Sequence, residues 1–218
     1  MPKKKANTSK ASALEAIELT PRNEFSKALS GWNSSRVRCG ALAKEVVDLR
    51  NETTYVTSDR VSEAVGVFVQ PSSLYIDVTE KLRGSLTQLG AQLEVMENCV
   101  EVMTSLLLVE REREDAPQLS LMRRDGDGKD IVNSTLTVDY EPLSKTIDVS
   151  FLEELVAETL QQTLLEKNLF ERLKCSTEGS SLNLGVDHDT SVTLLACYSY
   201  APCVNENSIK LALESLTV

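Results

Sequence analysis

The sequence predicts an all-α protein: an elongated three-helix bundle or coiled coil, with a small helical C-terminal cap and a disordered basic N-terminal tail. Two long segments carry apolar residues at alternating spacings of three and four, and a third carries a wider apolar stripe. The chain has only 9 Gly and 6 Pro in 218 residues, which is few for a turn-rich all-β fold. We expect a tail at residues 1–22, a long-helix bundle at 23–174 with a flexible loop at about 115–146, and the cap at 175–218.

The N-terminal tail is basic while the rest of the chain is acidic. Its lysines are Lys3, Lys4, Lys5 and Lys10, and the formal net charge of the whole chain is -10. A solvated, disordered segment is the main expectation, with a nuclear-import or nucleic-acid-touching role as the alternative. Thr20-Pro21 is the only Ser/Thr-Pro dipeptide and makes Thr20 a candidate phosphosite. The alternative is that Pro21 only stops a short preceding helix.

The first long helix is expected over residues 24–50. Its heptad stripe consists of Phe25, Ala28, Trp32, Ser35, Cys39, Leu42, Val46 and Leu49. Trp32 is the only tryptophan in the chain and is expected to anchor a core, with an exposed partner contact as the alternative. A Val-rich segment at 61–69 follows, and its pattern fits either a short strand or a buried helical piece.

The second long helix is expected over residues 75–112 and has the most regular pattern in the chain. We expect Pro71 to end the preceding segment and Ser72 or Ser73 to cap this helix. Its stripe consists of Leu82, Leu86, Leu89, Leu93, Met96, Val100, Met103 and Leu107. A helix of about 40 residues spans about 60 Å, so it needs a partner helix alongside it.

A third helix is expected over residues 148–173, after a connection without sustained period. Its stripe is wide enough to face two neighbours and consists of Phe151, Leu152, Leu155, Val156, Leu160, Leu164, Leu165, Leu169, Phe170 and Leu173. Residues 191–200 fit either a helix or a strand, and Pro202 stops that element. Asn205 can cap a last helix that carries Ile209, Ala212, Leu213 and Leu216 on one face.

Composition and motifs argue against several functional classes. The acidic body, with a sequence pI near 4.8, is unsuited to direct nucleic-acid binding. The chain has one His and five widely spaced Cys without a C-x-x-C pair, and it has no phosphate-binding glycine motif. No apolar run reaches the roughly 18 residues of a membrane span. We therefore expect no catalytic residues, no metal, no cofactor and no membrane association.

Three stretches together resemble the cyclin-dependent-kinase-interacting protein family (CINP). The first runs from Trp32 to the segment AKEVVDLR at 43–50, and the second is residues 151–173 with LLEK at 164–167. The third is APCVNENS at 201–208, closing in LALESL at 211–216. The chain departs from the family pattern at Cys203, where an aromatic residue is expected, and in the Val-rich insert.

The resemblance implies a non-enzymatic helical adaptor of a nuclear complex, found in the nucleus or in nucleus and cytoplasm. Its implied partners are a cell-cycle kinase, replication and checkpoint factors, and an AAA ATPase complex that acts in 60S ribosome biogenesis. The alternative function is a structural coiled-coil subunit of a kinetochore, tethering or cytoskeletal complex. The candidate seam and partner residues are Trp32, Leu42, Leu49, Leu86, Leu93, Met96, Val100, Met103, Leu107, Leu165, Phe170, Pro202 and Leu213.

Overall fold

The computed structural model describes residues 20–56, 71–115, 142–143, 147–178 and 188–217. These residues form the helices α1 (Pro21–Val56), α3 (Pro71–Asp115), α4 (Val149–Glu178), α5 (His188–Tyr200) and α6 (Glu206–Thr217). The all-α prediction is confirmed for this part of the chain, and residues 191–200 are helical. The basic tail before residue 20, the element at 61–69 and most of the 115–146 connection lie outside the described residues.

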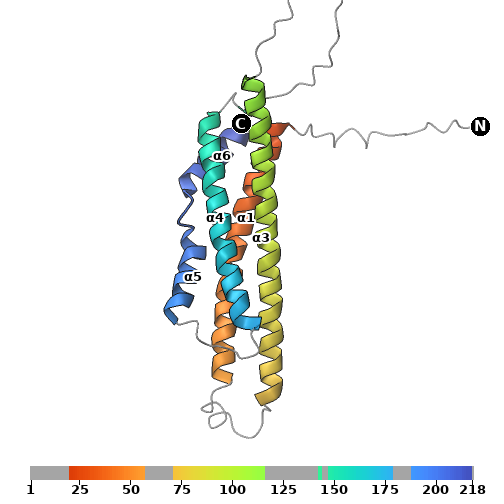
Figure 1. The fold of residues 1–218 in the computed structure, drawn as a ribbon, viewed down its shortest axis with the longest axis vertical. Helices are drawn as coiled ribbons and strands as arrows, with labels where there is room; N and C mark the ends of the chain where they lie inside the picture. The colour runs from red at the N-terminus through yellow and green to blue at the C-terminus, as the bar shows by residue number, and fades with distance from the viewer. Residues whose placement is uncertain (1–19, 57–70, 116–141, 144–146, 179–187, 218) are drawn as a thin grey trace, which may run out of the picture.

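The three long helices lie side by side, and the chain direction alternates from α1 to α3 to α4 (Figure 1). The short helices α5 and α6 follow each other along the flank of the bundle, so that together they take the place of a fourth helix. The C-terminal segment therefore covers a side of the bundle over much of its length. It does not close one end of the bundle.

The α1–α3 pair is the most extensive helix contact and forms the core of the fold. The whole apolar stripe of α3, from Leu82 to Leu107, is buried. On α1 the side chains of Phe25, Trp32 and Cys39 have no exposed surface. Burying each large apolar side chain contributes about 1.5–3 kcal/mol, and this outweighs the glycines that weaken both helices.

Two prolines begin helices that the sequence was expected to begin elsewhere. Pro21 is the first residue of α1, and the short helix that it was expected to stop lies outside the described residues. Thr20 caps this helix, since its Oγ1 accepts a hydrogen bond of 3.3 Å from the Asn23 N–H. Pro71 is likewise the first residue of α3, so Ser72 and Ser73 lie inside the helix and not at its cap.

The predicted apolar stripe of α4 is wrong at two positions. Leu160 and Leu164 are 44% and 49% exposed, whereas the polar residues Gln162 and Glu166 have no exposed surface. Thr159 and Thr163 are buried beside them. The helix is therefore rotated so that polar side chains face inward at its centre, and this orientation places two leucines on the surface.

The break between α5 and α6 explains part of this rotation. Ala201 has a φ of 41°, a left-handed conformation that ends α5 before Pro202. The freed backbone N–H groups need acceptors, and α4 supplies them: Cys203 N donates to Gln162 Oε1 at 3.2 Å, and Asn205 N donates to Glu158 Oε2 at 3.2 Å. The polar residues of α4 thus hold the two halves of the fourth helix.

The far end of α6 is fastened to the start of α1. Arg22 Nε donates to the Leu216 carbonyl at 2.8 Å, and Arg22 Nη2 donates to the Ser215 carbonyl at 2.9 Å. These carbonyls have no partner within the last helical turn, and a cation suits the negative end of the helix dipole. Ile209, Ala212 and Leu216 bury the apolar face of α6.

Gly84 offers a direct test of the α3 surface. A Cβ at Gly84 would meet nothing within 4 Å, whereas a Cβ at Gly90 would lie 3.2 Å from Phe170 Cζ. Because glycine inside a helix costs about 1 kcal/mol relative to alanine, we expect Gly84→Ala to raise the free energy of unfolding by about 0.5–1 kcal/mol. Gly90→Ala should give a smaller gain or a loss. Equal gains in urea titrations of both variants would contradict the packing of Phe170 on α3.

Candidate functional site

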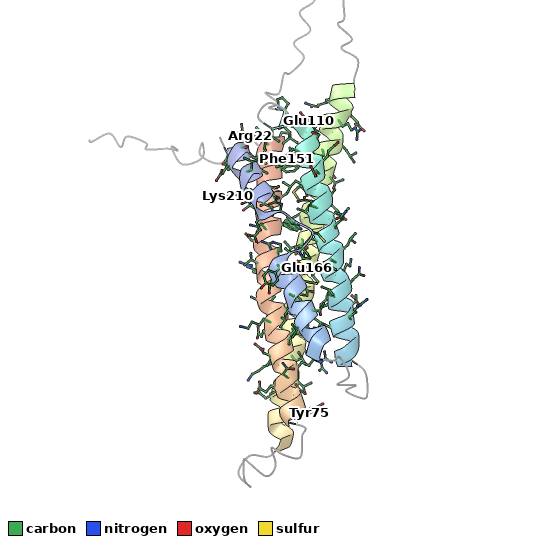
Figure 2. The ribbon with its side chains drawn as sticks, turned by 90° about the vertical axis from the view of Figure 1, so that its left-hand side faces the viewer. Arg22, Tyr75, Glu110, Phe151, Glu166 and Lys210 are labelled. Carbon is green, nitrogen blue, oxygen red and sulfur yellow. The ribbon has the colours of Figure 1, made fainter. Side chains whose placement is uncertain are left out.

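A buried polar layer crosses the middle of the bundle. Trp32 Nε1 on α1 donates a 2.9 Å hydrogen bond to Thr163 Oγ1 on α4, and Thr163 Oγ1 donates to the Thr159 carbonyl at 2.7 Å. Glu166, labelled in Figure 2, lies one turn farther along α4. The Tyr198 hydroxyl of α5 donates to the Glu166 carbonyl at 2.8 Å. The layer therefore joins α1, α4 and α5.

The Glu166 carboxyl group is the least satisfied member of this layer. Gln162 Nε2 donates to its Oε1 at 2.7 Å, but no described residue is hydrogen-bonded to its Oε2. Burial raises the pKa of Glu166 to about 7, and the hydrogen bond from Gln162 and the charge of Arg36 act in the opposite direction. The carboxyl group is therefore poised to change its charge near neutral pH.

The neighbouring thiol and phenol stay protonated. Burial, with a smaller contribution from Glu166, raises the pKa of Cys39 to about 12, and the Cys39 sulfur lies 3.7 Å from Met96 Sδ. Burial also raises the pKa of Tyr198. A protonated, fully buried thiol is a poor nucleophile. The layer therefore supplies hydrogen bonds between helices, and its arrangement does not resemble a reactive centre.

The other described residues do not gather into a metal centre. Within the described ranges no group of three His, Cys, Asp or Glu side chains is arranged to hold a metal ion. Cys39, Cys99, Cys197 and Cys203 are free thiols. No helix in this part of the chain is long and apolar enough to cross a membrane.

A groove of about 1040 Å³ runs between α3 and α4 and onto the lower end of α1. Figure 1 shows the reason for its position: α1 and α3 extend beyond the end of α4, so none of the other described helices lies beside their lower part. Tyr75, labelled near the lower end in Figure 2, lines this part of the groove. Leu86, Leu93 and Phe170 also line it, and Phe170 lies over Gly90.

Charged residues around the groove are unevenly distributed. Lys167 forms an ion pair with Glu97 between α4 and α3. Its pKa is raised first by this hydrogen bond and then by the charges of Glu97, Glu171 and Glu94. One lysine thus faces three glutamates at the upper end of the groove. Arg83 and Lys174 line the groove farther toward its lower end.

A row of exposed leucines continues from the upper end of the groove. Leu160 and Leu164 on α4 and Leu108 on α3 form this leucine row, and each is 44–57% exposed. Helical spacing places four residues on one face of α4: Glu153, Leu160, Leu164 and Lys167. It likewise places three residues on one face of α3: Glu97, Leu108 and Arg111. The ion pairs Lys167–Glu97 and Arg111–Glu153 join these two faces and bracket the leucine row.

A second exposed apolar row lies elsewhere on α3. Val95, Val102 and Val109 are spaced by seven residues and are 41–45% exposed. Their helical phase differs from that of the buried stripe by about a quarter turn or more. This valine row therefore follows α3 on a face that the described helices do not cover.

Most of the candidate residues predicted from the sequence lie in the core. Trp32, Leu86, Leu93, Met96, Val100, Met103 and Leu107 are buried. Leu42, Leu49, Leu165, Phe170 and Leu213 are partly buried against the core. Pro202 is exposed at the α5–α6 break, and Thr20 is half-buried at the helix cap. Of these candidates, the structure brings only Leu86, Leu93 and Phe170 together at the groove.

The leucine row and the valine row, on the outer surface of α3 and α4, were not predicted from the sequence. The leucine row includes two residues that were expected in the core, and the valine row was not noticed. One signal was available: Thr159, Thr163 and Glu166 are spaced by four and three residues, and Gln162 lies beside them. A polar stripe with that period competes with the apolar stripe for the inner face of the helix.

Comparison of the chain with protein-family models, with curated proteins and with solved structures finds no match in any of the three.

Proposed function

We propose that this protein is a non-enzymatic helical adaptor that binds other proteins through the outer surface of its long helices. The observation that carries the proposal is the leucine row and the valine row, which lie outside a core that is already filled. Aliphatic side chains exposed in rows along helices, rather than scattered singly, are typical of protein-binding surfaces.

The bundle provides a rigid support for such a surface. The heptad stripes of α1 and α3 face each other, so these helices do not need a second chain to bury their apolar residues. Within the polar layer, the Trp32–Thr163 hydrogen bond joins α4 to α1, and the Tyr198–Glu166 hydrogen bond joins α5 to α4. An adaptor of this kind presents rows of side chains on fixed helices, which reduces the entropy lost on binding.

The resemblance to the CINP family supplies a more specific form of the proposal. In that form the chain is a subunit of a nuclear complex, and its partners are a cell-cycle kinase, replication and checkpoint factors, or an AAA ATPase complex that acts on 60S ribosomal particles. The acidic body favours protein partners over direct contact with nucleic acid.

The alternative is a structural coiled-coil subunit of a kinetochore, tethering or cytoskeletal complex. In that case α1 and α3 would pair chiefly with helices of other subunits. The internal pairing of their buried stripes favours the adaptor. Urea unfolding of the isolated chain distinguishes the two, because a self-contained bundle unfolds cooperatively as a monomer. A chain that is poorly helical until it meets its partners would favour the alternative.

Co-purification of the full-length chain tests the proposed function. We expect the tagged chain to recover at least one protein at near-stoichiometric amounts, and an AAA ATPase among the recovered proteins would support the family-based form. Leu160→Ser with Leu164→Ser, or Val95→Ser with Val102→Ser, should reduce that recovery at least tenfold. Val37→Ser, an exposed apolar residue of α1, is the matched control.

These substitutions should leave the fold intact, because exposed positions change stability by about 0.5 kcal/mol or less. Circular dichroism of each variant checks this point. A folded monomer that recovers no protein would contradict the proposal.

A further inference from the structure

The α3–α4 groove and the leucine row form one continuous surface. The groove extends from the overhang of α1 and α3 up to the Lys167–Glu97 ion pair, and the leucine row continues from that pair to Arg111–Glu153. From Arg83 to Leu108, α3 spans about 38 Å at 1.5 Å per residue, which is the length of a helix of about 25 residues. The surface is therefore long and narrow, with apolar and charged residues in the groove and leucines beyond it.

The α3 wall of the groove includes small residues. Ala91 lines the groove without a large side chain, and the Phe170 ring lies over Gly90. Leu86, Leu93 and Phe170 form the apolar part of the groove wall. Apolar walls beside small residues accept side chains that are spaced by three and four residues on a docked helix.

The charges give the surface a direction. At the upper end of the groove, near the middle of the whole surface, Glu94, Glu97 and Glu171 face Lys167, so three negative charges meet one positive charge. Toward its lower end Arg83 and Lys174 line the groove. A complementary ligand therefore carries positive charge where it meets Glu94 and Glu171, and negative charge where it meets Arg83.

We propose that the α3–α4 groove and the leucine row bind one amphipathic helix of a partner protein. Its apolar face lies along Phe170 and the leucine row, its acidic end meets Arg83, and basic residues near its middle meet Glu94 and Glu171. Because acidic residues favour the N-terminus of a helix, the bound helix runs parallel to α3. This inference rests on the proposed adaptor function and specifies the surface and the partner chemistry.

The test uses two synthetic helical peptides of about 25 residues with the same apolar face. Peptide one carries glutamates in its first two turns and lysines near its middle, and peptide two has these charges exchanged. Fluorescence anisotropy with the full-length chain should show peptide one binding at least tenfold more tightly than peptide two. In the variant Glu94→Lys with Glu171→Lys, this preference should fall below threefold, because Arg83 still favours peptide one whereas the new lysines favour peptide two.

The fall in preference controls for any difference in helicity between the peptides, because it compares the same two peptides on two proteins. The matched control is Glu45→Lys with Asp48→Lys, which makes the same charge change on exposed positions of α1 and should leave the preference unchanged. Binding that ignores the peptide charges, or that survives Leu160→Ser with Leu164→Ser, would overturn the proposal.

A second measurement tests two other possible occupants of the groove, a segment of the same chain and a second copy of it. A photoreactive amino acid at Thr87, which lines the groove, reports what lies there. Cross-links to residues 57–70 or 179–187 of the same chain, or to a second copy of it, would overturn the proposal. If a native partner is still recovered by the Glu94→Lys, Glu171→Lys and Leu160→Ser variants, the adaptor function stands and this surface is not its binding site.

Discussion

Replacing Trp32 with alanine is expected to remove a large part of the stability of the protein. Its side chain is fully buried, is the largest in the core, and donates the 2.9 Å hydrogen bond to Thr163 that links α1 to α4. Truncation of a buried aromatic residue costs about 3–5 kcal/mol, against a total free energy of unfolding of about 5–15 kcal/mol for a typical domain. Chemical unfolding followed by circular dichroism measures the loss.

Two gentler variants separate the packing of Trp32 from its hydrogen bond. Trp32→Phe keeps an aromatic ring and should cost about 1–3 kcal/mol, partly because the indole donor is lost. Thr163→Val leaves the indole N–H buried without its acceptor and should cost about 1–3 kcal/mol. In a double-mutant cycle the two losses should not add, because both remove the same bond. Strict additivity would contradict the contact between α1 and α4.

Replacing Glu166 with glutamine is expected to stabilise the protein at neutral and alkaline pH. The pKa of the carboxyl group is 4.5 in its ordinary environment and about 7 in the folded chain. The folded state therefore holds the proton more tightly than the unfolded state does. Near pH 4.5 and below the group imposes no penalty, and stability is lost as the pH rises through about 7.

The size of this effect follows from the pKa difference. A pKa difference of 1 corresponds to about 1.4 kcal/mol, so the ionised Glu166 should lower the free energy of unfolding by on the order of 3 kcal/mol above pH 8. Glu166→Gln should show this advantage at pH 8 and little of it at pH 5. The groups that face Glu166 are Arg36 and Cys39 on α1, Gln162 on α4 and Tyr198 on α5.

The matched control for Glu166→Gln is an exposed glutamate of the same helix. Glu154→Gln changes the same charge in a solvated position and should give a difference of less than about 0.5 kcal/mol at either pH. If Glu166→Gln raised the free energy of unfolding equally at pH 5 and pH 8, the Glu166 carboxyl group would not be ionised in the folded core at pH 8.

The long helices could be predicted from the sequence because their periodic signal is strong and local. Eight apolar residues of α3 at heptad spacing define both the helix and its inner face, and all of them are buried. On α1 six of the eight predicted stripe residues are buried, and the other two, Leu42 and Leu49, are partly buried against the core. Helix starts were less predictable, since a proline at the first helical position and a proline after a helix look alike in one sequence.

The orientation of α4 could not be predicted because it depends on a distant part of the chain. The break at Ala201 leaves the backbone N–H groups of Cys203 and Asn205 in need of acceptors, and Gln162 and Glu158 on α4 supply them. A helix rotated to meet this demand exposes Leu160 and Leu164. Apolar periodicity alone predicts that those leucines lie in the core, because the pattern contains no information about long-range hydrogen bonds.

The groove could not be predicted for a different reason. It depends on where α4 ends relative to α3, and on the approach of Phe170 to Gly90. Both are properties of how two helices are placed against each other, and neither leaves a pattern within one segment. Glu94 and Glu171 are 77 residues apart in the sequence, and only the packing of α3 against α4 brings them to one lysine.

Lysine cross-linking of the purified native complex, followed by mass spectrometry, tests the central claim most directly. Lys167 and Lys174 line the groove, whereas Lys44 on α1 and Lys210 on α6 lie outside it. We expect links between the chain and its partner to come mainly from Lys167 and Lys174, together with links inside the chain that join the long helices. Partner links concentrated at Lys44 and Lys210, without links between the long helices of the same chain, would contradict an adaptor that presents its α3–α4 face.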